Sequence, residues 1–309
     1  MQLIRGLESI TKQLQPCVAT IGKFDGIHIG HQQIINEVIR LAKLQNRESA
    51  VIVFEPDPQE FFAGENAPAR LTRFREKWRI FKQLGVEKVI CLKFSEALAS
   101  MKAEHFIDDL LVEKLAVKHL IVGDDFRFGV KRSGDYALLQ QHGAGKFEVQ
   151  NTASITHGVD RVSSTLVRQY LANGKFDLAE KLLGRRYSIE GKVAHGDKLG
   201  RTINFPTLNL ALKRKVSPLQ GVFLVKVFGL ANECFWGVAN IGRRPTVKGN
   251  INRLEVHVFD FEKDCYGKEV TVEFVRKIRD EKKFDSVEFL KQQIAIDVDN
   301  AKRKIELLN

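Results

Sequence analysis

The chain is 309 residues long, carries a net charge of +11, and is 44% hydrophobic and 28% charged. This length is about twice that of a typical domain, so we expect two domains. The composition excludes a collagenous or disordered chain, and no stretch approaches the roughly 18 uncharged apolar residues of a spanning helix. Charges interrupt the first residues, which argues against an export signal. We therefore expect a cytoplasmic protein that does not bind membranes.

The positive charge fits a nucleic-acid-binding protein and a protein that handles polyphosphates equally well. Most of the excess lies after residue 184 and is dispersed there, so we expect no nucleic-acid surface. The cysteines are far apart and lack the spacing of metal ligands. We interpret all four as reduced thiols of the core: Cys17, Cys91, Cys234 and Cys265.

The first 150 residues alternate short β-branched runs with segments of helical period, which is typical of βα units and a parallel sheet. Strands are predicted at 17–22, 51–54, 86–94, 119–123 and 147–151. Helices are predicted at about 30–46, 72–84, 103–116 and 135–142. Parallel sheets bind ligands at the carboxyl ends of their strands, so the loops after residues 21, 54 and 122 should converge on a site.

Two further helices are predicted at 163–173 and 176–183, and the glycine at 184 suggests a boundary between domains 1–183 and 184–309. Beyond it the apolar residues alternate with period two, as in half-buried antiparallel strands. Five strands are predicted, enough for a small barrel: 187–195, 221–230, 234–242, 254–258 and 270–274. The chain ends on an amphipathic helix, whose apolar stripe is Val287, Leu290, Ile294, Val298, Ala301, Ile305 and Leu308.

Residues 22–31, directly after the first predicted strand, read Gly-Lys-Phe-Asp-Gly-Ile-His-Ile-Gly-His. Glycines let a backbone approach a ligand closely, and the N-terminus of the following helix attracts anions. His28 and His31 can contact the same phosphate group and stabilise the charge that grows on it during transfer. The segment resembles the HxGH nucleotidyltransferase superfamily, in the GxFDGxHxGH form of prokaryotic bifunctional riboflavin kinase/FMN adenylyltransferases.

The resemblance implies a Rossmann-like adenylyltransferase domain with catalytic His28 and His31. It implies ATP contacts by Gly22, Phe24, Asp25, Gly30, Ser163, Ser164, Thr165 and Arg168. It implies FMN contacts by Phe54, Pro56, Pro58, Asp125 and Phe126. Lys23 and Leu166 depart from the residues usual in the family, and a side-chain role for Lys23 is therefore not expected.

Hydroxyls at a helix start, as in the Ser-Ser-Thr run, cap free N–H groups or bind phosphate whatever the family. An arginine one turn later can reach the same anion.

The second half contains neither a Walker-type phosphate loop nor the glycine loop of protein kinases. Residues 191–209 instead resemble the riboflavin kinase stretch GxVxHGxxxGRxxxFPTxN. The resemblance implies ATP or phosphate contacts by Gly191, Gly196, Gly200, Arg201, Pro206, Thr207 and Asn209. The oxygens of Thr207 and Asn209 are hard ligands of the kind that Mg²⁺ prefers, and the resemblance implies that they hold this ion.

Residues 237–246 match the family segment GVANIGxRPT, with Arg243 in place of the commoner threonine. Glu255 lies on an alternating strand and matches the family's catalytic carboxylate, which accepts the proton of the ribityl hydroxyl. Arg279 and Glu281 match the LRxExxF segment, and the resemblance places them near the flavin.

The sequence thus predicts an α/β protein: a Rossmann-like HxGH nucleotidyltransferase domain with a parallel sheet, then an antiparallel β-barrel riboflavin kinase domain with a terminal helix. The resemblance implies Mg²⁺, ATP as co-substrate, and riboflavin, FMN and FAD as substrates or products. Flavin-accepting apoproteins are a further candidate class of partner. Three alternatives stay open: one activity alone, a basic nucleic-acid-binding module, and a flavin-binding barrel without catalysis.

Overall fold

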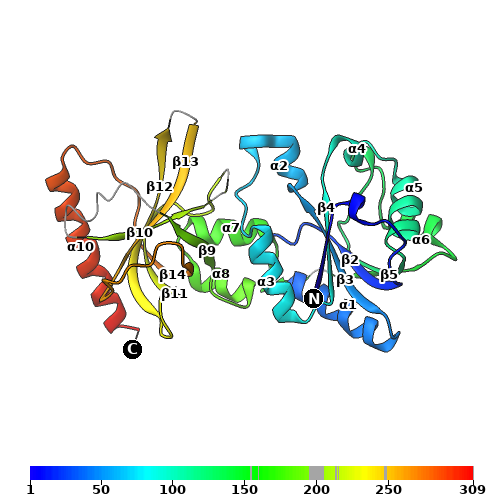
Figure 1. Ribbon diagram of the computed structural model, residues 1–309, viewed down its shortest axis with the longest axis horizontal. Coiled ribbons are helices and arrows are strands. Elements are labelled where there is room, and N and C mark those ends of the chain that lie inside the picture. Colours follow the sequence, from blue (N-terminus) through cyan, green and yellow to red (C-terminus); the bar gives the residue numbers. More distant parts are fainter. Residues whose placement is uncertain are drawn as a thin grey trace. The chain divides into compact units, whose positions relative to one another are not determined.

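The computed structural model describes residues 1–153, 155–158, 160–194, 205–212, 214, 216–246 and 249–308, with backbone only at 157, 243–246 and 249–252. The chain forms two compact units (Figure 1). The first comprises Met1–Pro68 and Thr72–Ser164, and the second comprises Ala69–Leu71 and Thr165–Asn309. The helices predicted at 163–173 and 176–183 thus belong almost entirely to the second unit. The functional boundary at 183/184 stays a prediction.

The first unit is built on a six-stranded parallel sheet with the order β1-β4-β3-β2-β5-β6. Its strands are β1 (Gln2–Arg5), β2 (Cys17–Ile21), β3 (Glu48–Glu55), β4 (Lys88–Lys93), β5 (Val117–Gly123) and β6 (Glu148–Thr152). The order reverses at β2, which has β3 on one side and β5 on the other. In such sheets ligands bind at the carboxyl ends beside the reversal. The predicted parallel sheet is confirmed, and β1 is an edge strand that the sequence analysis missed.

Both faces of this sheet are covered, which explains why its strands read as continuous apolar runs. One core cluster joins Ala19, Ile52 and Ile90 to the segment 106–115, and another joins Val51 and Val89 to α1 and α3. The α-helices of the chain up to residue 161 are α1 (Ile29–Leu44), α2 (Pro58–Ala63), α3 (Phe74–Leu84), α4 (Glu96–Ala99), α5 (Ala103–His105) and α6 (Tyr136–Gly143). The same part of the chain contains the 3₁₀ turns η1 (Leu7–Ser9), η2 (Gly64–Asn66) and η4 (Val130–Arg132) and the π-helix η3 (Phe106–Lys114). Two short strands, β7 (Thr156–His157) and β8 (Asp160–Arg161), pair with each other. Most of the helix predicted at 103–116 is therefore a π-helix.

The second unit contains a closed antiparallel barrel with the order β10-β13-β12-β11-β14-β9. Its strands are β9 (Ser188–Ala194), β10 (Thr207–Ala211), β11 (Gly221–Phe228), β12 (Phe235–Thr246), β13 (Gly249–Val258) and β14 (Glu269–Arg279), and its helices are α7 (Ser164–Ala172), α8 (Phe176–Leu183) and α10 (Val287–Glu306). Phe176 of α8 packs against Phe223 and Phe274 of the barrel, with ring centroids 5.9 and 6.5 Å away. The predicted barrel is confirmed.

The terminal helix α10 covers the outer face of β11, β12 and β14. Val298 and Ala301 of the predicted stripe are buried there, in a cluster with Val222, Leu224 and Val238. The ends of the stripe differ from the prediction. Val287 and Leu308 are 47% and 40% exposed, because they lie in the first turn of α10 and just beyond its last residue.

Three of the cysteines, Cys17, Cys91 and Cys265, are buried as predicted, whereas Cys234 is exposed. The prediction was wrong for Cys234, which precedes β12 directly in the turn after β11. Within the described part of the chain none of the four forms a disulfide. Among the described residues, no helix combines the length and the apolar character needed to cross a membrane.

Candidate active sites

The loop between β2 and α1 has an unusual backbone. Phe24, Gly26 and Ile27 have φ angles of 46°, 82° and 42°, all in the left-handed region. A non-glycine residue there is strained by about 1–3 kcal/mol unless its surroundings hold it. The side chains of Phe24 and Ile27 are 3% and 0% exposed and are held by the core. Consecutive N–H groups in such a turn form a concave anion site.

His28 and His31 lie together where this loop enters α1. His28 caps the helix, since its Nδ1 accepts the N–H of His31 at 3.3 Å. The two rings stack with centroids 3.6 Å apart and an interplanar angle of 17°. Nδ1 of His31 is buried and has no hydrogen-bond partner among the described residues. The two predicted histidines therefore lie together at the start of α1, and their catalytic roles stay predictions.

Burial lowers the pKa of His31 well below its usual range, and the charges of His28, Lys77 and Lys23 lower it further. His31 is accordingly neutral at physiological pH. A neutral imidazole beside the helix N-terminus can donate its one N–H to a phosphate oxygen.

Residues just before α3 and in its first turns hold this loop by hydrogen bonds. The N–H of Thr72 donates to Oδ1 of Asp25 at 2.9 Å, and the N–H of Gly26 donates to Oγ1 of Thr72 at 2.8 Å. Nζ of Lys77 donates to the carbonyl of Lys23. Asp25 is thus buried and holds the loop, and its predicted ATP contact stays a prediction. The sequence analysis did not predict Thr72 and Lys77 as site residues. Lys77 could have been found, because a lysine four residues before Phe81 falls on the apolar face of the predicted helix and is therefore expected to be buried.

The Ser-Ser-Thr run is divided between the two units. Ser163 is half-buried, and Oγ of Ser164 donates to the carbonyl of Asp25 at 2.8 Å. Thr165 and Arg168 belong to the second unit, where Nε of Arg168 donates to the carbonyl of Ala69 at 2.5 Å. Ser164 therefore supports the phosphate loop, and the other ATP contacts stay predictions.

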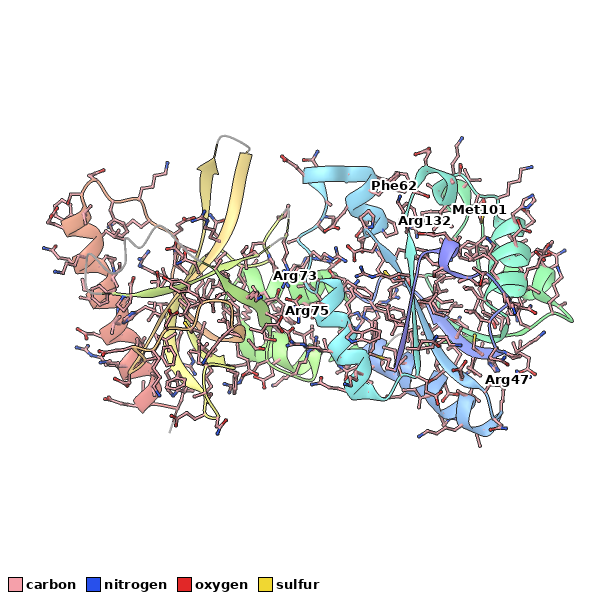
Figure 2. All side chains as sticks on the ribbon, in the orientation of Figure 1. Arg47, Phe62, Arg73, Arg75, Met101 and Arg132 are labelled. Carbon is pink, nitrogen blue, oxygen red and sulfur yellow. The ribbon has the colours of Figure 1, made fainter. Side chains whose placement is uncertain are left out.

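Aromatic side chains gather after β3, where FMN contacts are predicted. Phe94 makes edge-to-face contacts with Phe54, Phe61 and Phe62, at centroid distances of 5.8, 5.3 and 5.7 Å. Phe62 lies on α2 (Figure 2) and is 70% exposed. Of the predicted contacts, Pro56 precedes α2 and Pro58 is its first residue. The sequence analysis found Phe54 and missed the three other aromatics, because they lie outside its motif.

The loop after β5 is tied to β8. Arg161 forms ion pairs with Asp124 at 2.8 Å and with Asp125 at 3.3 Å. Phe126 is half-buried and stacks on Phe128, with centroids 5.5 Å apart. Asp125, predicted to contact FMN, is largely exposed and engaged by Arg161.

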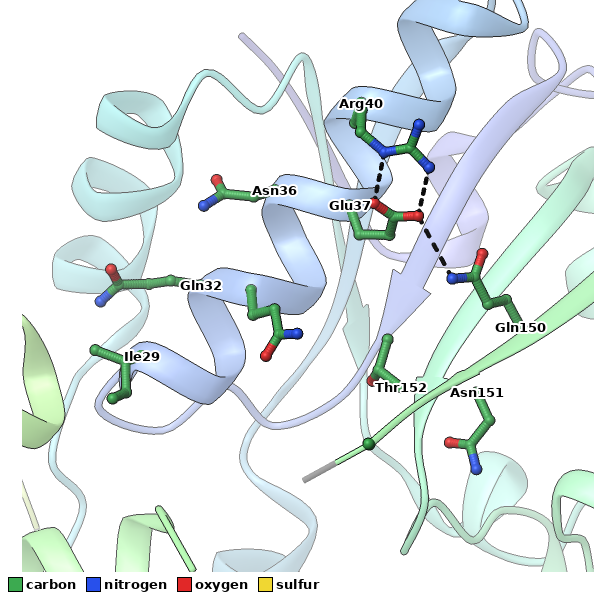
Figure 3. Close-up of a pocket in the computed structure, with 10 residues that line it drawn as sticks. Ile29, Gln32, Asn36, Glu37, Arg40, Gln150, Asn151 and Thr152 are labelled. Atoms are coloured by element: carbon green, nitrogen blue, oxygen red, sulfur yellow. Dashed lines mark hydrogen bonds and ion pairs between the residues drawn. The ribbon is translucent and has the colours of Figure 1, made fainter. Parts of the chain in front are cut away.

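A polar pocket of about 620 Å³ lies between α1 and the end of β6 (Figure 3). It was not predicted. Its lining is rich in amide side chains and consists of Ile29, Gln32, Gln33, Asn36, Glu37, Arg40, Gln150, Asn151, Thr152 and Ala153. Glu37 accepts two 2.7 Å bonds from Arg40 and one of 3.4 Å from Gln150. The first lining residue in the sequence, Ile29, lies between the two histidines. The lining also includes the end of β6, which lies beyond β5 on one side of the point where the strand order reverses.

In the barrel, strand register brings three polar side chains into one row. Glu255 of β13 lies opposite Asn209 of β10 and opposite Asn240 of β12. Directly opposite residues of antiparallel strands share a face, and the neighbours Leu254 and Val256 are buried on the other face. The row therefore lies on the outer side of the barrel. Asn240 was quoted within its motif but was not predicted as a site residue.

Thr207 and Asn209 fit the predicted Mg²⁺ site by their chemistry. Both are half-buried on β10, and a hydroxyl oxygen, an amide oxygen and a nearby carboxylate form a hard donor set. Thr207 lies opposite His257, whose Nδ1 is 3.0 Å from the carbonyl of Pro206. Among the described residues no group of three or more His, Cys, Asp and Glu is placed to hold a metal.

Arg279, predicted near the flavin, is engaged by α10. Its Nε and Nη2 donate to the carboxylate of Asp297 at 2.9 and 2.7 Å, and its guanidinium lies 5.7 Å from the ring centroid of Phe284. Glu281 accepts a hydrogen bond from Gln220 at 3.0 Å. The flavin contacts of Arg279 and Glu281 stay predictions.

The remaining predicted kinase residues lie partly outside the described structure. Gly191 packs closely on β10, because a Cβ there would come within 2.7 Å of a Leu210 methyl group. Gly196, Gly200 and Arg201 lie outside the described residues, as does the side chain of Arg243.

Comparison with known proteins gives one result over the whole chain. Residues 10–166 match the family model described as FAD synthetase, and residues 183–305 match that described as riboflavin kinase. Bifunctional riboflavin kinase/FMN adenylyltransferases of Escherichia coli (strain K12) and Haemophilus influenzae are 48% and 49% identical, over 96% and 98% of both chains respectively. A crystal structure described as a macrolide-efflux protein from Streptococcus pneumoniae superposes with a TM-score of 0.79, at 29% identity over 98% of this chain and 99% of that one. The chain belongs to the family of bifunctional riboflavin kinase/FMN adenylyltransferases.

Proposed function

We propose that this chain makes FAD in two steps. Residues 184–309 transfer the γ-phosphoryl group of ATP to riboflavin, giving FMN. Residues 1–183 then transfer the adenylyl group of a second ATP to FMN, giving FAD and pyrophosphate. The observation that carries the proposal is the presence of two separate groups of candidate catalytic residues on one chain: the stacked His28–His31 pair at a strained loop, and the Glu255 row on the barrel.

In adenylyl transfer, a phosphate oxygen of FMN attacks the α-phosphorus of ATP, and the bond to pyrophosphate breaks. The N–H groups of the loop and the N-terminus of α1 face the anion. His28 and His31 stabilise the charge that grows on the α-phosphate. Positioning and charge stabilisation suffice, because no protein group is covalently modified.

The two organic groups have separate places in this unit. We place the flavin ring against Phe62, since an exposed aromatic face backed by Phe61 and Phe94 is suited to stacking. We place the adenosine of ATP in the pocket between α1 and β6, because its amide groups can bond a base edge or a ribose hydroxyl. One lining residue of the pocket, Ile29, lies between the two histidines in the sequence.

In the kinase step, Glu255 accepts the proton of the ribityl 5′-hydroxyl as that oxygen attacks the γ-phosphorus, and ADP leaves. Thr207 and Asn209 would hold Mg²⁺, which when bound neutralises phosphate charge. Asn240, on the other side of Glu255, is placed to orient the carboxylate or the hydroxyl. We place both steps in the cytoplasm and propose that the products pass to flavin-accepting apoproteins.

The direct test is to incubate the purified chain with riboflavin, ATP and Mg²⁺ and to separate the flavins over time. We expect FMN first and FAD later. Formation of neither product would overturn the proposal. Salt-dependent retention on DNA without ATP turnover would then favour the nucleic-acid-binding alternative.

A further inference from the structure

Lys77 of α3 is a lysine in the core of the first unit. It is 1% exposed and is among the largest fully buried side chains of the described structure. An ammonium ion is strongly hydrated, so its burial is unfavourable unless protein groups replace the water. Nζ of Lys77 donates to the main-chain carbonyl of Lys23, in the phosphate loop. The loop therefore takes part of the hydrogen bonding that water would give to this charge.

A second buried lysine gives a natural contrast. Lys88 is 3% exposed and forms an ion pair with Glu48. Both residues are the first of their strands, β4 and β3, so the pair lies at the amino ends of the sheet. The HxGH loop follows the carboxyl end of β2. Burial of a lysine in this unit is thus compatible with a purely structural pair far from the loop, whereas the partners of Lys77 include a main-chain carbonyl of the phosphate loop.

The loop that Lys77 contacts cannot keep its shape by itself. Phe24 and Ile27 have positive φ angles, which persist only when the surroundings over-determine them. The start of α3 supplies two supports: Thr72 binds Asp25 and Gly26, and Lys77 binds the carbonyl of Lys23. These contacts span the segment that leads into His28.

We propose that Lys77 is a positioning residue for adenylyl transfer, because its buried ammonium fixes the phosphate loop and holds a positive charge beside the two histidines. The inference rests on the proposed adenylyl transfer and deepens it. Lys77 acts through the loop and through His31, and does not itself contact the reacting atoms.

The charge has a consequence that a purely mechanical support lacks. Burial is the largest cause of the lowered pKa of His31, and the charges of His28, Lys77 and Lys23 lower this pKa further. Two of these charged groups belong to the segment of His31 itself, and Lys77 comes from α3. Removal of the Lys77 charge raises the pKa of His31 toward its usual value. In this proposal the neutral ring, which is the form present at physiological pH, is the active form, so activity is then lost at a higher pH during acidification.

The test compares Lys77→Met with Lys88→Met in the full chain. For Lys77→Met we expect kcat of FMN adenylylation to fall about 100-fold, as for a misplaced catalytic group, with KM for FMN changed less than about threefold. The acid limb of its pH profile should move to higher pH. Riboflavin kinase turnover should be unchanged and serves as an internal control. Lys88→Met should lower thermal stability but leave kcat and the acid limb of adenylylation as in the wild type.

Two further variants keep the test decisive if Lys77→Met does not fold. Lys77→Arg retains the charge, so its acid limb should match the wild type although kcat falls. Thr72→Val removes the hydroxyl that binds Gly26 and Asp25 but keeps the main-chain N–H bond to Asp25 and the charge, so kcat should fall with no shift of the acid limb. Wild-type kcat and pH profile in Lys77→Met, or in both of these variants, overturn the inference. Absence of FAD formation by the wild-type chain would instead refute the proposed function.

Discussion

The site of the first unit depends mainly on the main chain, whereas the site of the second unit depends mainly on side chains. In the first, main-chain geometry dominates: residues 22–31 form a strained loop and a helix start, and Thr72, just before α3, holds them by hydrogen bonds. In the barrel, side chains dominate: Asn209, Glu255 and Asn240 are brought together by register across three strands. The first site should therefore be sensitive to substitutions behind the loop. The second should be sensitive mainly to the side chains of the row.

The sharpest test of this contrast is His28→Asn, which keeps a good helix cap and removes the imidazole. We expect FAD formation from supplied FMN to fall about 1000-fold, as for the loss of a transition-state donor. FMN formation from riboflavin should be unchanged. His105→Asn, at an exposed histidine paired with Asp109, is the matched control. Equal losses in both activities would refute a site confined to the first unit.

The reciprocal variant is Glu255→Gln, which preserves shape and removes the base. FMN formation should fall by about 100-fold or more, the usual contribution of a general base, while supplied FMN is still converted to FAD. Glu269→Gln on β14, in the same barrel, should leave both rates alone. Retained kinase activity in Glu255→Gln would remove the carboxylate from the mechanism.

The contact between Arg279 and α10 predicts an effect on stability. Asp297→Asn removes the carboxylate that Arg279 binds with two nitrogens. Breaking this largely buried pair should lower the free energy of unfolding of the second unit by about 3 kcal/mol, the lower end of the range for buried pairs, because the Arg279 side chain is 22% exposed. Asp299→Asn, an exposed position on the same helix, should change it little. Denaturant unfolding measures both, and equal midpoints would show that the pair does not anchor α10.

The smallest effect is expected at the flavin face of the first unit. Phe62→Ala should raise KM for FMN about tenfold with little change in kcat, because stacking of one aromatic ring contributes about 1 kcal/mol or slightly more. Phe228→Ala, an exposed phenylalanine of β11, is the control. An unchanged KM for FMN would move the flavin away from α2.

Much of this fold could be predicted from local patterns. The parallel sheet follows from β-branched runs between helical segments, and the HxGH site lies within ten consecutive residues. β10 (Thr207–Ala211) was missed because its residues were interpreted as part of the FPTxN motif and not as a strand. β1 was missed because it is short and pairs along one side only, with β4.

The supports of the sites could not be predicted in the same way. Thr72 and Lys77 contact residues that lie 46 to 54 positions earlier, and local periodicity holds no information about such pairs. The row around Glu255 depends on the register of three strands, which a one-residue slip would destroy. The motif predicted Glu255 and Asn209 separately. Only the fold placed Asn240 beside them.

The central claim is that two independent sites on one chain act in sequence, and a mixing experiment tests it most directly. Neither His28→Asn nor Glu255→Gln alone should form FAD from riboflavin, ATP and Mg²⁺ at an appreciable rate. A mixture of the two variants should form FAD, because FMN made by the first is adenylylated by the second. A mixture that forms FMN but no FAD, although Glu255→Gln converts supplied FMN, would contradict the account.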